Sequence, residues 1–395
     1  YNMKYVFYIM ILLCSQVSLA AQPFHFDGWS SSGEPVTVVP EDSLASVSVF
    51  AQYIASHYAT PEERISAVYD WITHNVAYDI VMKNKLYFEV DEPKIAAETL
   101  AQRRGVCYHY ATLLKAVADS LGMKAYSMQG YAKIGGKVED APHAWCVIQL
   151  EDNWYFFDPT FDSGGLRNGK DFVRMPKRDY YRKSPEEMIV SHMPFDPMWQ
   201  FLSHPLSYDE FENPEPKEVR GELFNWKDSL NVYVGLSPIE QMETIINRIL
   251  KNGTRNQSVE SVLVVLRQNL QITKMNDRVE RVNTASSLYN KALSHFNGFI
   301  TYRNNQFKPN KEEAEVRKMI TDCNDLMEQA TKELEQIREP EPNILENMQN
   351  LKGLMQTLQT AINEQQQFVD KYYSTGKLFR KTLFYKIKWM GIPLN

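Results

Sequence analysis

The chain has 395 residues, a formal net charge of −6 and a sequence pI of about 5.9. Its length favours two domains. Nucleic-acid-binding chains carry a basic electrostatic footprint, so this acidic balance argues against a nucleic-acid partner. The four cysteines, at 14, 107, 146 and 323, are too few and too scattered for a disulfide framework or a zinc site. We also expect no metal and no cofactor.

The first 21 residues have the pattern of a secretory signal peptide. Lys4 supplies a positive charge, residues 5–13 are an apolar run, and Ser18-Leu19-Ala20 offers small residues for cleavage after Ala20 or Ala21. The run is too short to span a membrane. We expect export to the periplasm, the cell surface or the medium. A lipoprotein with Cys14 lipidated is the alternative, which Leu13 before it fits poorly; an ordinary buried helix is another.

A first domain is predicted over residues 43–212, after an extension at 22–42. Apolar spacing predicts helices over 44–58, 61–75, 94–103 and 106–121, with a cap at Asp42-Ser43 for the first. Thr60-Pro61-Glu62-Glu63 has the residues of a helix start, and Gly122 those of a helix end. Strands are expected over 123–131, 144–150 and 154–158, with a polar loop at 133–141. The last two strands form a hairpin through Glu151-Asp152-Asn153. Residues 77–91 are ambiguous.

Three residues of this domain suit thiol catalysis. Gly105 is a turn that leads Cys107 into the start of a helix, where the amides and the helix dipole stabilise a thiolate. By strand parity His143 shares a face with Trp145 and Val147, and Asp158 shares one with Trp154 and Phe156. His143 and Asp158 can therefore meet at one end of the hairpin, and a helix packed on that face would bring Cys107 to them. His143 would act as base and acid, and Asp158 would orient it.

Other residues near these positions have weaker assignments. The backbone N–H of Cys107 is the expected first oxyanion donor, and Gln102 is a candidate for the second. Tyr108 and Trp145 are expected to line the cleft. Cys146 points away from His143 and belongs to the core. His109 lies on another helix face, and His192, in a loop before Met193-Pro194, is expected to be non-catalytic.

Three blocks of sequence carry a family resemblance. They are Gly105-Val106-Cys107-x-x-Tyr110-Ala111, His143-Ala144-Trp145, and Trp154-Tyr155-x-x-Asp158-Pro159-Thr160. In order and spacing they resemble the transglutaminase-like superfamily over about residues 44–211. The resemblance implies an α+β, papain-like core, with the cysteine on a helix and the histidine and aspartate on an antiparallel sheet. It also implies acyl transfer on amide or peptide bonds through a thioester, with a protein or peptide substrate.

The sequence also departs from part of that family. Calcium-dependent animal transglutaminases carry Trp after the nucleophile, where this chain has Tyr108. No acidic loop of the EF-hand type is present in the sequence, so we expect no calcium dependence. Microbial members and the cytoskeletal peptidase-like branch are more similar, since residues 158–165 match their Asp-Pro-Thr sequence followed by Gly.

The C-terminal part is predicted to be an all-α bundle over 238–395, after a linker at 213–237 with an extended segment at 222–230. Helices are expected over 238–251, 258–272, 277–297, 312–337 and 343–373. The last two have heptad-like apolar stripes, and Glu339-Pro340-Glu341-Pro342 separates them into an antiparallel hairpin. We prefer a bundle core to a partner-binding coiled coil. Residues 377–390 are basic and apolar, and either dock on the bundle or contact an anionic membrane.

Together these observations predict an exported thiol enzyme that attacks an amide carbonyl with Cys107. Water or an amine would resolve the acyl-enzyme, giving a peptidase, an amidase or an acyltransferase. The alternative is a catalytically idle papain-like module that binds peptide or cell-envelope polymer, with a helical scaffold for partners.

Overall fold

A computed structural model describes residues 37–82, 91–214, 223–253 and 256–385, and the backbone alone at 388–389 and 392–393. The predicted signal peptide, with Cys14, lies outside the described residues, as does most of the 22–42 extension. The chain divides into two compact units. One comprises the chain up to Ser229 together with Asn252–Val259, and the other comprises Leu230–Lys251 and the chain from Glu260 onward.

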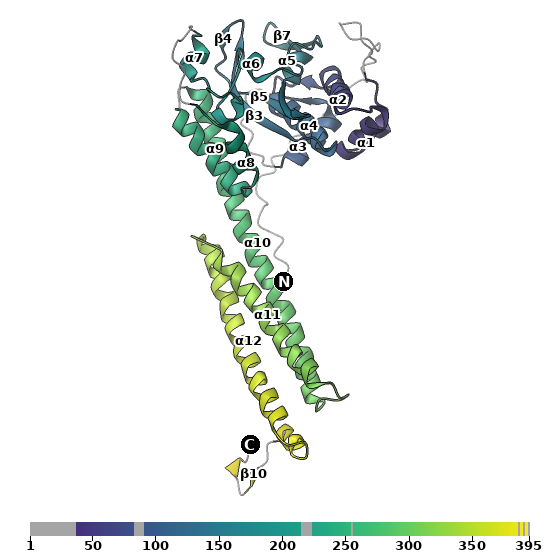
Figure 1. Cartoon of the computed structure of the whole chain (residues 1–395), viewed down its shortest axis with the longest axis vertical. Helices are drawn as coiled ribbons and strands as arrows, with labels where there is room; N and C mark the ends of the chain where they lie inside the picture. Colours follow the sequence, from purple (N-terminus) through teal and green to yellow (C-terminus); the bar gives the residue numbers. More distant parts are fainter. Residues whose placement is uncertain are drawn as a thin grey trace. The chain divides into compact units, whose positions relative to one another are not determined.

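The first unit is an α+β fold (Figure 1). Its helices are α1 (Val47–His57), α2 (Pro61–Asn75), α3 (Glu92–Gln102), α4 (Cys107–Ser120), α5 (Pro159–Ser163), α6 (Pro185–Met188) and α7 (Tyr208–Glu212), with 3₁₀ helices η1 (Glu41–Leu44) and η2 (Pro197–Gln200). Its strands are β1 (Ala77–Tyr78), β2 (Arg104–Gly105), β3 (Ala125–Ile134), β4 (Lys137–Val138), β5 (His143–Leu150), β6 (Asn153–Phe157), β7 (Gly164–Arg167), β8 (Asp171–Arg174) and β9 (His192–Pro194).

The predicted helices of this unit are confirmed, with one change at the first. α2 begins with a capping box, in which Thr60 Oγ1 accepts from the Glu63 N–H and the Glu63 carboxylate accepts from the Thr60 N–H. The cap predicted at Asp42-Ser43 is wrong. Residues 41–44 form η1, and Ser46, whose backbone is extended, caps α1 through its Oγ and the Val49 N–H.

The central sheet is antiparallel and built around β3, which pairs with β4, β5 and β9, while β5 also pairs with β6. The predicted 133–141 loop is wrong in part, because β3 continues to Ile134 and turns into β4. Gly135 and Gly136 form this turn at φ of 60° and 80°, the left-handed region that a two-residue hairpin requires.

Gly130 allows β9 to join the sheet. It is paired with His143 on β5 and with Pro194 on β9. A Cβ at this position would lie 2.1 Å from the carbonyl oxygen of Met193, so only glycine permits β9 to lie this close to β3.

Helix α4 packs on the sheet face opposite to the one predicted. Its Leu113, Leu114 and Val117 share one hydrophobic core with Cys146 and Ile148 of β5. Trp145 and Val147 are buried outside that core, on the other face. The expectation that α4 would cover the His143 face is therefore wrong. Residues 144–148 of β5 are all apolar and are buried on both sides of the sheet, so the sequence does not say which side takes the helix.

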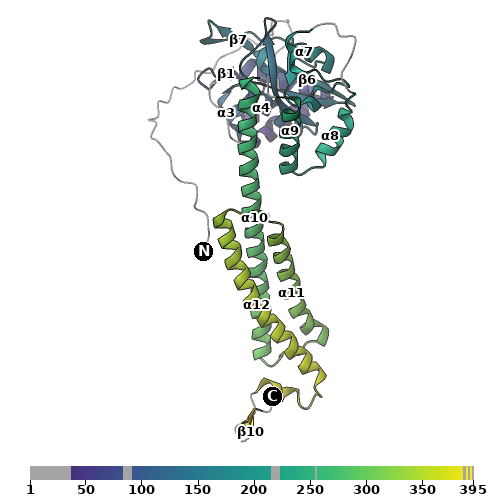
Figure 2. The same cartoon turned by 90° about the vertical axis from the view of Figure 1, so that its left-hand side faces the viewer.

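The second unit is helical, and its long helices run side by side in Figures 1 and 2. Its elements are α8 (Trp226–Val234, which begins in the first unit), α9 (Pro238–Asn252), α10 (Gln257–Asn304), α11 (Glu313–Glu335), α12 (Pro342–Ser374), η3 (Arg380–Phe384), β10 (Lys388–Trp389) and β11 (Ile392–Pro393).

Two predictions for the C-terminal part are wrong. The segment read as extended over 222–230 contains the start of α8, where Asn225 Oδ1 accepts from the Asp228 N–H. The two helices predicted over 258–272 and 277–297 are one helix, α10. The intervening Thr273-Lys274-Met275-Asn276 contains neither Gly nor Pro, so nothing in it breaks the helix.

The predicted apolar stripes are confirmed as the core of the bundle. Their described members are buried together with residues of α10. α11 and α12 are antiparallel, since Arg317 pairs with Asp370 while Gln359 hydrogen-bonds to Asn324. Of residues 377–390, Phe384 packs against the bundle.

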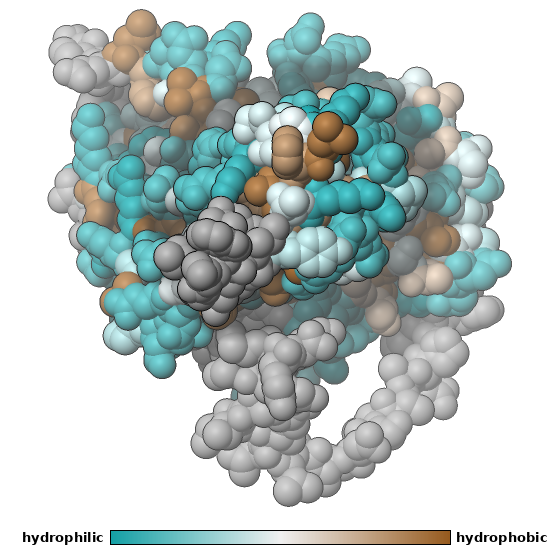
Figure 3. All heavy atoms as spheres, turned by 90° about the horizontal axis from the view of Figure 1, so that it is seen from below, coloured by the Kyte–Doolittle hydropathy of each residue, from teal (hydrophilic) through white to brown (hydrophobic). Residues whose placement is uncertain are grey.

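Figure 3 shows hydrophobic residues in small groups among hydrophilic ones on one face. None of the helices described here is both long enough and apolar enough to cross a bilayer.

Candidate active site

Cys107 is the first residue of α4, as predicted. The side chain of His109 supports this helix start by accepting a 3.4 Å hydrogen bond from the Val106 N–H at Nδ1. His109 packs so closely on Gly105 that a Cβ there would lie 2.4 Å from the His109 Cβ. The thiol is half-buried. Because the first N–H groups of a helix have no intrahelical partner, the amides around Cys107 can face an anion.

Asp158 follows β6 directly and is the N-cap of α5. Its Oδ1 accepts hydrogen bonds from the N–H groups of Thr160, at 2.9 Å, and Phe161, at 3.2 Å. The assignment of Asp158 to the second strand is therefore wrong by one residue: β6 ends at Phe157. Pro159 has no N–H to continue the strand pairing and suits the first position of a helix.

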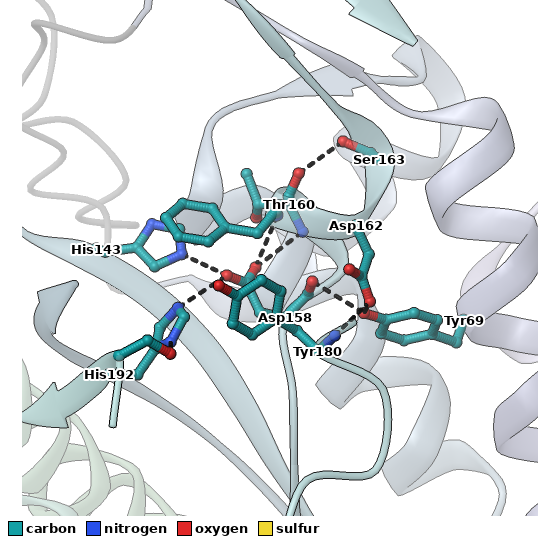
Figure 4. Close-up of polar contacts among 10 residues, drawn as sticks. Tyr69, His143, Asp158, Thr160, Asp162, Ser163, Tyr180 and His192 are labelled. Carbon is teal, nitrogen blue, oxygen red and sulfur yellow. Dashed lines mark hydrogen bonds and ion pairs between the residues drawn. The ribbon is translucent and has the colours of Figure 1, made fainter. Parts of the chain in front are cut away.

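His143 is the first residue of β5, and its Nε2 lies 2.7 Å from Asp158 Oδ2 (Figure 4). Cys107 lies close enough to the imidazole to contribute to raising the pKa of His143. The ring also stacks on Phe161 with centroids 4.4 Å apart. The structure thus brings Cys107, His143 and Asp158 together.

The charges of His143 and Asp158 stabilise each other. Burial alone lowers the pKa of His143, but the Asp158 charge, its hydrogen bond and the interactions with Cys107 together raise it to about 10. Burial likewise raises the pKa of Asp158, but His143 and His192 outweigh it and hold this pKa well below its usual range. An ionised Asp158 beneath an imidazolium His143 is the arrangement that stabilises a thiolate at Cys107.

The sequence interpretation missed His192 as a member of this site. Instead of lying in a loop, His192 begins β9, and its Nε2 lies 3.2 Å from Asp158 Oδ2 (Figure 4). Its Nδ1 lies 2.8 Å from the Ser191 Oγ. A three-residue strand is too short to show alternation, so no periodic signal could have identified it.

The three residues expected near the cleft have different surroundings. Trp145 is fully buried, and its ring stacks on His143 with centroids 5.9 Å apart. Its Nε1 has no hydrogen-bond partner among the described residues. Tyr108 is half-buried, with its ring edge-on to His109. Gln102 is the exposed last residue of α3, and nothing in the described part of the chain joins its side chain to the triad.

His143, Asp158 and His192 each offer a ligand atom, and these atoms lie within 4.8 Å of one another. A cation there would need the lone pairs of both Nε2 atoms. In the structure both nitrogens lie at hydrogen-bond distance from Asp158 Oδ2, and since an ionised carboxylate only accepts, each nitrogen donates a proton to it when Asp158 is ionised. The cluster therefore has the contacts of a hydrogen-bond network centred on Asp158.

Part of the chain is similar in sequence to known proteins. Kyphoscoliosis peptidase of Homo sapiens is 28% identical over 161 residues, covering 39% of this chain and 24% of that protein. Hillarin of Drosophila melanogaster is 24% identical over 199 residues, covering 45% of this chain and 23% of that protein. The chain thus spans about a quarter of the length of these relatives.

Two solved structures are also similar to part of the chain. A putative cysteine protease from Cytophaga hutchinsonii is 23% identical, covering 36% of this chain and 49% of that one, with a TM-score of 0.25. The periplasmic domain of TgpA from Pseudomonas aeruginosa is 23% identical, covering 32% and 47%, also with a TM-score of 0.25.

The family model of the transglutaminase-like superfamily matches residues 49–159. The match includes Cys107, His143 and Asp158 and extends from α1 to the first residue of α5. Residues 49–159 therefore form a domain of the transglutaminase-like superfamily.

Proposed function

We propose that this protein is a thiol enzyme that transfers the acyl group of an amide or peptide bond through Cys107. One observation carries the proposal. The imidazole of His143 is held 2.7 Å from a buried carboxylate and interacts with Cys107, a cysteine at a helix start. The name of one relative, kyphoscoliosis peptidase, supports a peptide substrate.

In the proposed reaction the Cys107 thiolate adds to the substrate carbonyl carbon, and the carbonyl oxygen becomes an oxyanion that faces the Cys107 N–H. When the tetrahedral intermediate collapses, the C–N bond breaks and the leaving amine takes a proton from His143. The product is a thioester on Cys107. Water or a second amine then attacks it, gives its proton to His143, and releases the thiolate with an acid or a new amide.

Alkylation of Cys107 tests the activated thiol without any substrate. We expect iodoacetamide to react with the wild type well below pH 8.5, and His143→Ala to move the reaction to the range of an ordinary thiol. Cys107→Ser provides the blank for the buried Cys146 and Cys323. A wild-type profile near pH 8.5 that His143→Ala leaves unchanged would refute the proposal.

A peptide screen with and without an added primary amine assigns the outcome. Shorter peptides identify a peptidase, ammonia an amidase or deamidase, and amine conjugates an acyltransferase. In the alternative outcome the wild type binds peptide without releasing any product, and Cys107→Ser binds it equally well. That pair of results would favour the catalytically idle binding module.

Export is a separate proposal that depends on residues 1–21. Expression of the full chain followed by mass spectrometry of the mature N-terminus tests it. Cleavage after Ala20 or Ala21 is the expected result, and an uncleaved product retained inside the cell would contradict it.

A further inference from the structure

The carboxylate of Asp158 accepts four hydrogen bonds in a fully buried position. Its Oδ1 accepts from two backbone N–H groups of α5, and its Oδ2 accepts from His143 at 2.7 Å and from His192 at 3.2 Å. An ionised carboxylate has about four lone-pair positions. All four are therefore occupied, and the fourth donor is His192.

The surroundings of His192 select a single protonation state. A neutral imidazole has one donor and one acceptor nitrogen. Because Nε2 donates to Asp158, Nδ1 must accept from the hydroxyl of Ser191 at 2.8 Å. Burial also lowers the pKa of His192, which keeps the ring neutral despite the neighbouring carboxylate.

Packing and backbone pairing also hold the ring of His192. Its centroid lies 5.0 Å from those of Trp145 and Tyr180, and 5.1 Å from that of Phe161. Only 1% of the residue is exposed. His192 pairs with Ala132 of β3, so its position depends on the main sheet that also carries His143. The titratable groups that face it are His143, Asp158 and Tyr180.

We propose that His192 is a positioning residue of the active site: its Nε2–H holds Oδ2 of Asp158 in place beneath His143. This inference rests on the proposed function. The two amides of α5 fix one oxygen of Asp158, and His192 fixes the other. The carboxylate can then neither rotate nor turn away from His143, and His143 keeps the orientation that Cys107 needs.

Two variants separate hydrogen bonding from packing. His192→Gln keeps an N–H donor near the position of Nε2, whereas His192→Leu fills the site without one. The alkylation rate of Cys107 is measured against pH in both variants and in the wild type, after unfolding melts establish that each is folded. We expect His192→Leu to move the acid limb of the profile upward by about one pH unit, and His192→Gln to stay close to the wild type.

Each outcome decides a different point. Equal shifts of the alkylation profile in both variants would assign His192 a packing role. No shift in either variant would show that His192 does not affect the site. Both results would overturn the inference but would not contradict the activation of Cys107. A wild-type profile of an ordinary thiol would instead refute the proposed function. Imidazole ¹⁵N NMR of the wild type gives a check that needs no variant. The neutral Nε2–H tautomer of His192 at pH 7 is expected, and the Nδ1–H tautomer would overturn the inference.

Discussion

The hydroxyl of Tyr69 lies 2.5 Å from Oδ2 of Asp162, in the core next to the candidate active site (Figure 4). The same hydroxyl donates to the backbone carbonyl of Asp158 at 2.9 Å. A tyrosine has one proton to donate, so an ionised Asp162 would have to share that proton with the carbonyl, whereas a protonated Asp162 could donate to the hydroxyl and free the tyrosine proton for the carbonyl. Burial, which is the largest cause, and the nearby Asp158 charge raise the pKa of Asp162 to about 7.

The first prediction concerns the pH dependence of stability that Asp162 causes. Its pKa is raised in the folded state, so its contribution to stability is complete below about pH 4 and is lost as the pH rises to about 7. In that window the unfolding free energy should fall by about 1.4 kcal/mol per pH unit from this group. Asp162→Asn imitates the protonated form and should remove this component.

Urea unfolding of the wild type and of Asp162→Asn at pH 5 and pH 8 measures the pH-dependent contribution of Asp162 to the unfolding free energy. The difference between the two proteins isolates Asp162 from other titrating groups, since both share them. Asp162→Asn should gain stability relative to the wild type at pH 8. An identical pH dependence in both proteins would show that Asp162 is ionised throughout.

The second prediction is that Asp158 supports the fold as well as the site. Asp158→Ala leaves four donors without an acceptor, three of them buried, and should lower the unfolding free energy by about 3 kcal/mol or more. Asp152→Ala, at an exposed position of the β5–β6 turn, is the control and should have little effect. Equal stability of the two variants would contradict the proposed network.

The third prediction concerns Gly130. Gly130→Ala places a Cβ against the Met193 carbonyl and should displace β9, costing about 1–3 kcal/mol of stability. His192 should move with β9, so the alkylation profile of Cys107 should shift toward that of His192→Leu. Gly165→Ala on β7 meets nothing within 4 Å and is the matched control. A Gly130→Ala variant as stable as this control would contradict the close approach of β9.

The fourth prediction tests the helical unit. Ile362 of α12 is fully buried, and Ile362→Ala should destabilise the bundle by about 2–5 kcal/mol through lost burial and the cavity left behind. Leu354 of the same helix is 53% exposed, so Leu354→Ala should change stability by about 0.5 kcal/mol or less. Helicity measured by circular dichroism during thermal unfolding distinguishes the two.

Local signals in the sequence were sufficient for two helix starts and one hairpin of the first unit. The cap at Thr60, the helix start at Cys107 and the β5–β6 hairpin each depend on residues a few positions apart. The side of the sheet that α4 covers depends on tertiary packing, because the apolar residues 144–148 of β5 point to both faces of the sheet. The contact of His192 with Asp158 joins residues 34 positions apart and shows no local pattern. Such a contact becomes visible only once Gly130 brings β9 to the sheet.

The three described cysteines are free thiols in three different environments. Cys107 is half-buried, Cys146 is fully buried in the core of the first unit, and Cys323 is fully buried in the core of the helical bundle. A thiol reagent therefore meets Cys107 in the native protein, Cys146 when the first unit opens, and Cys323 when the bundle opens. Mass spectrometry of the labelled peptides would follow the reactivity of the site and the opening of each unit in a single sample. The wild-type sequence thus contains its own set of folding reporters.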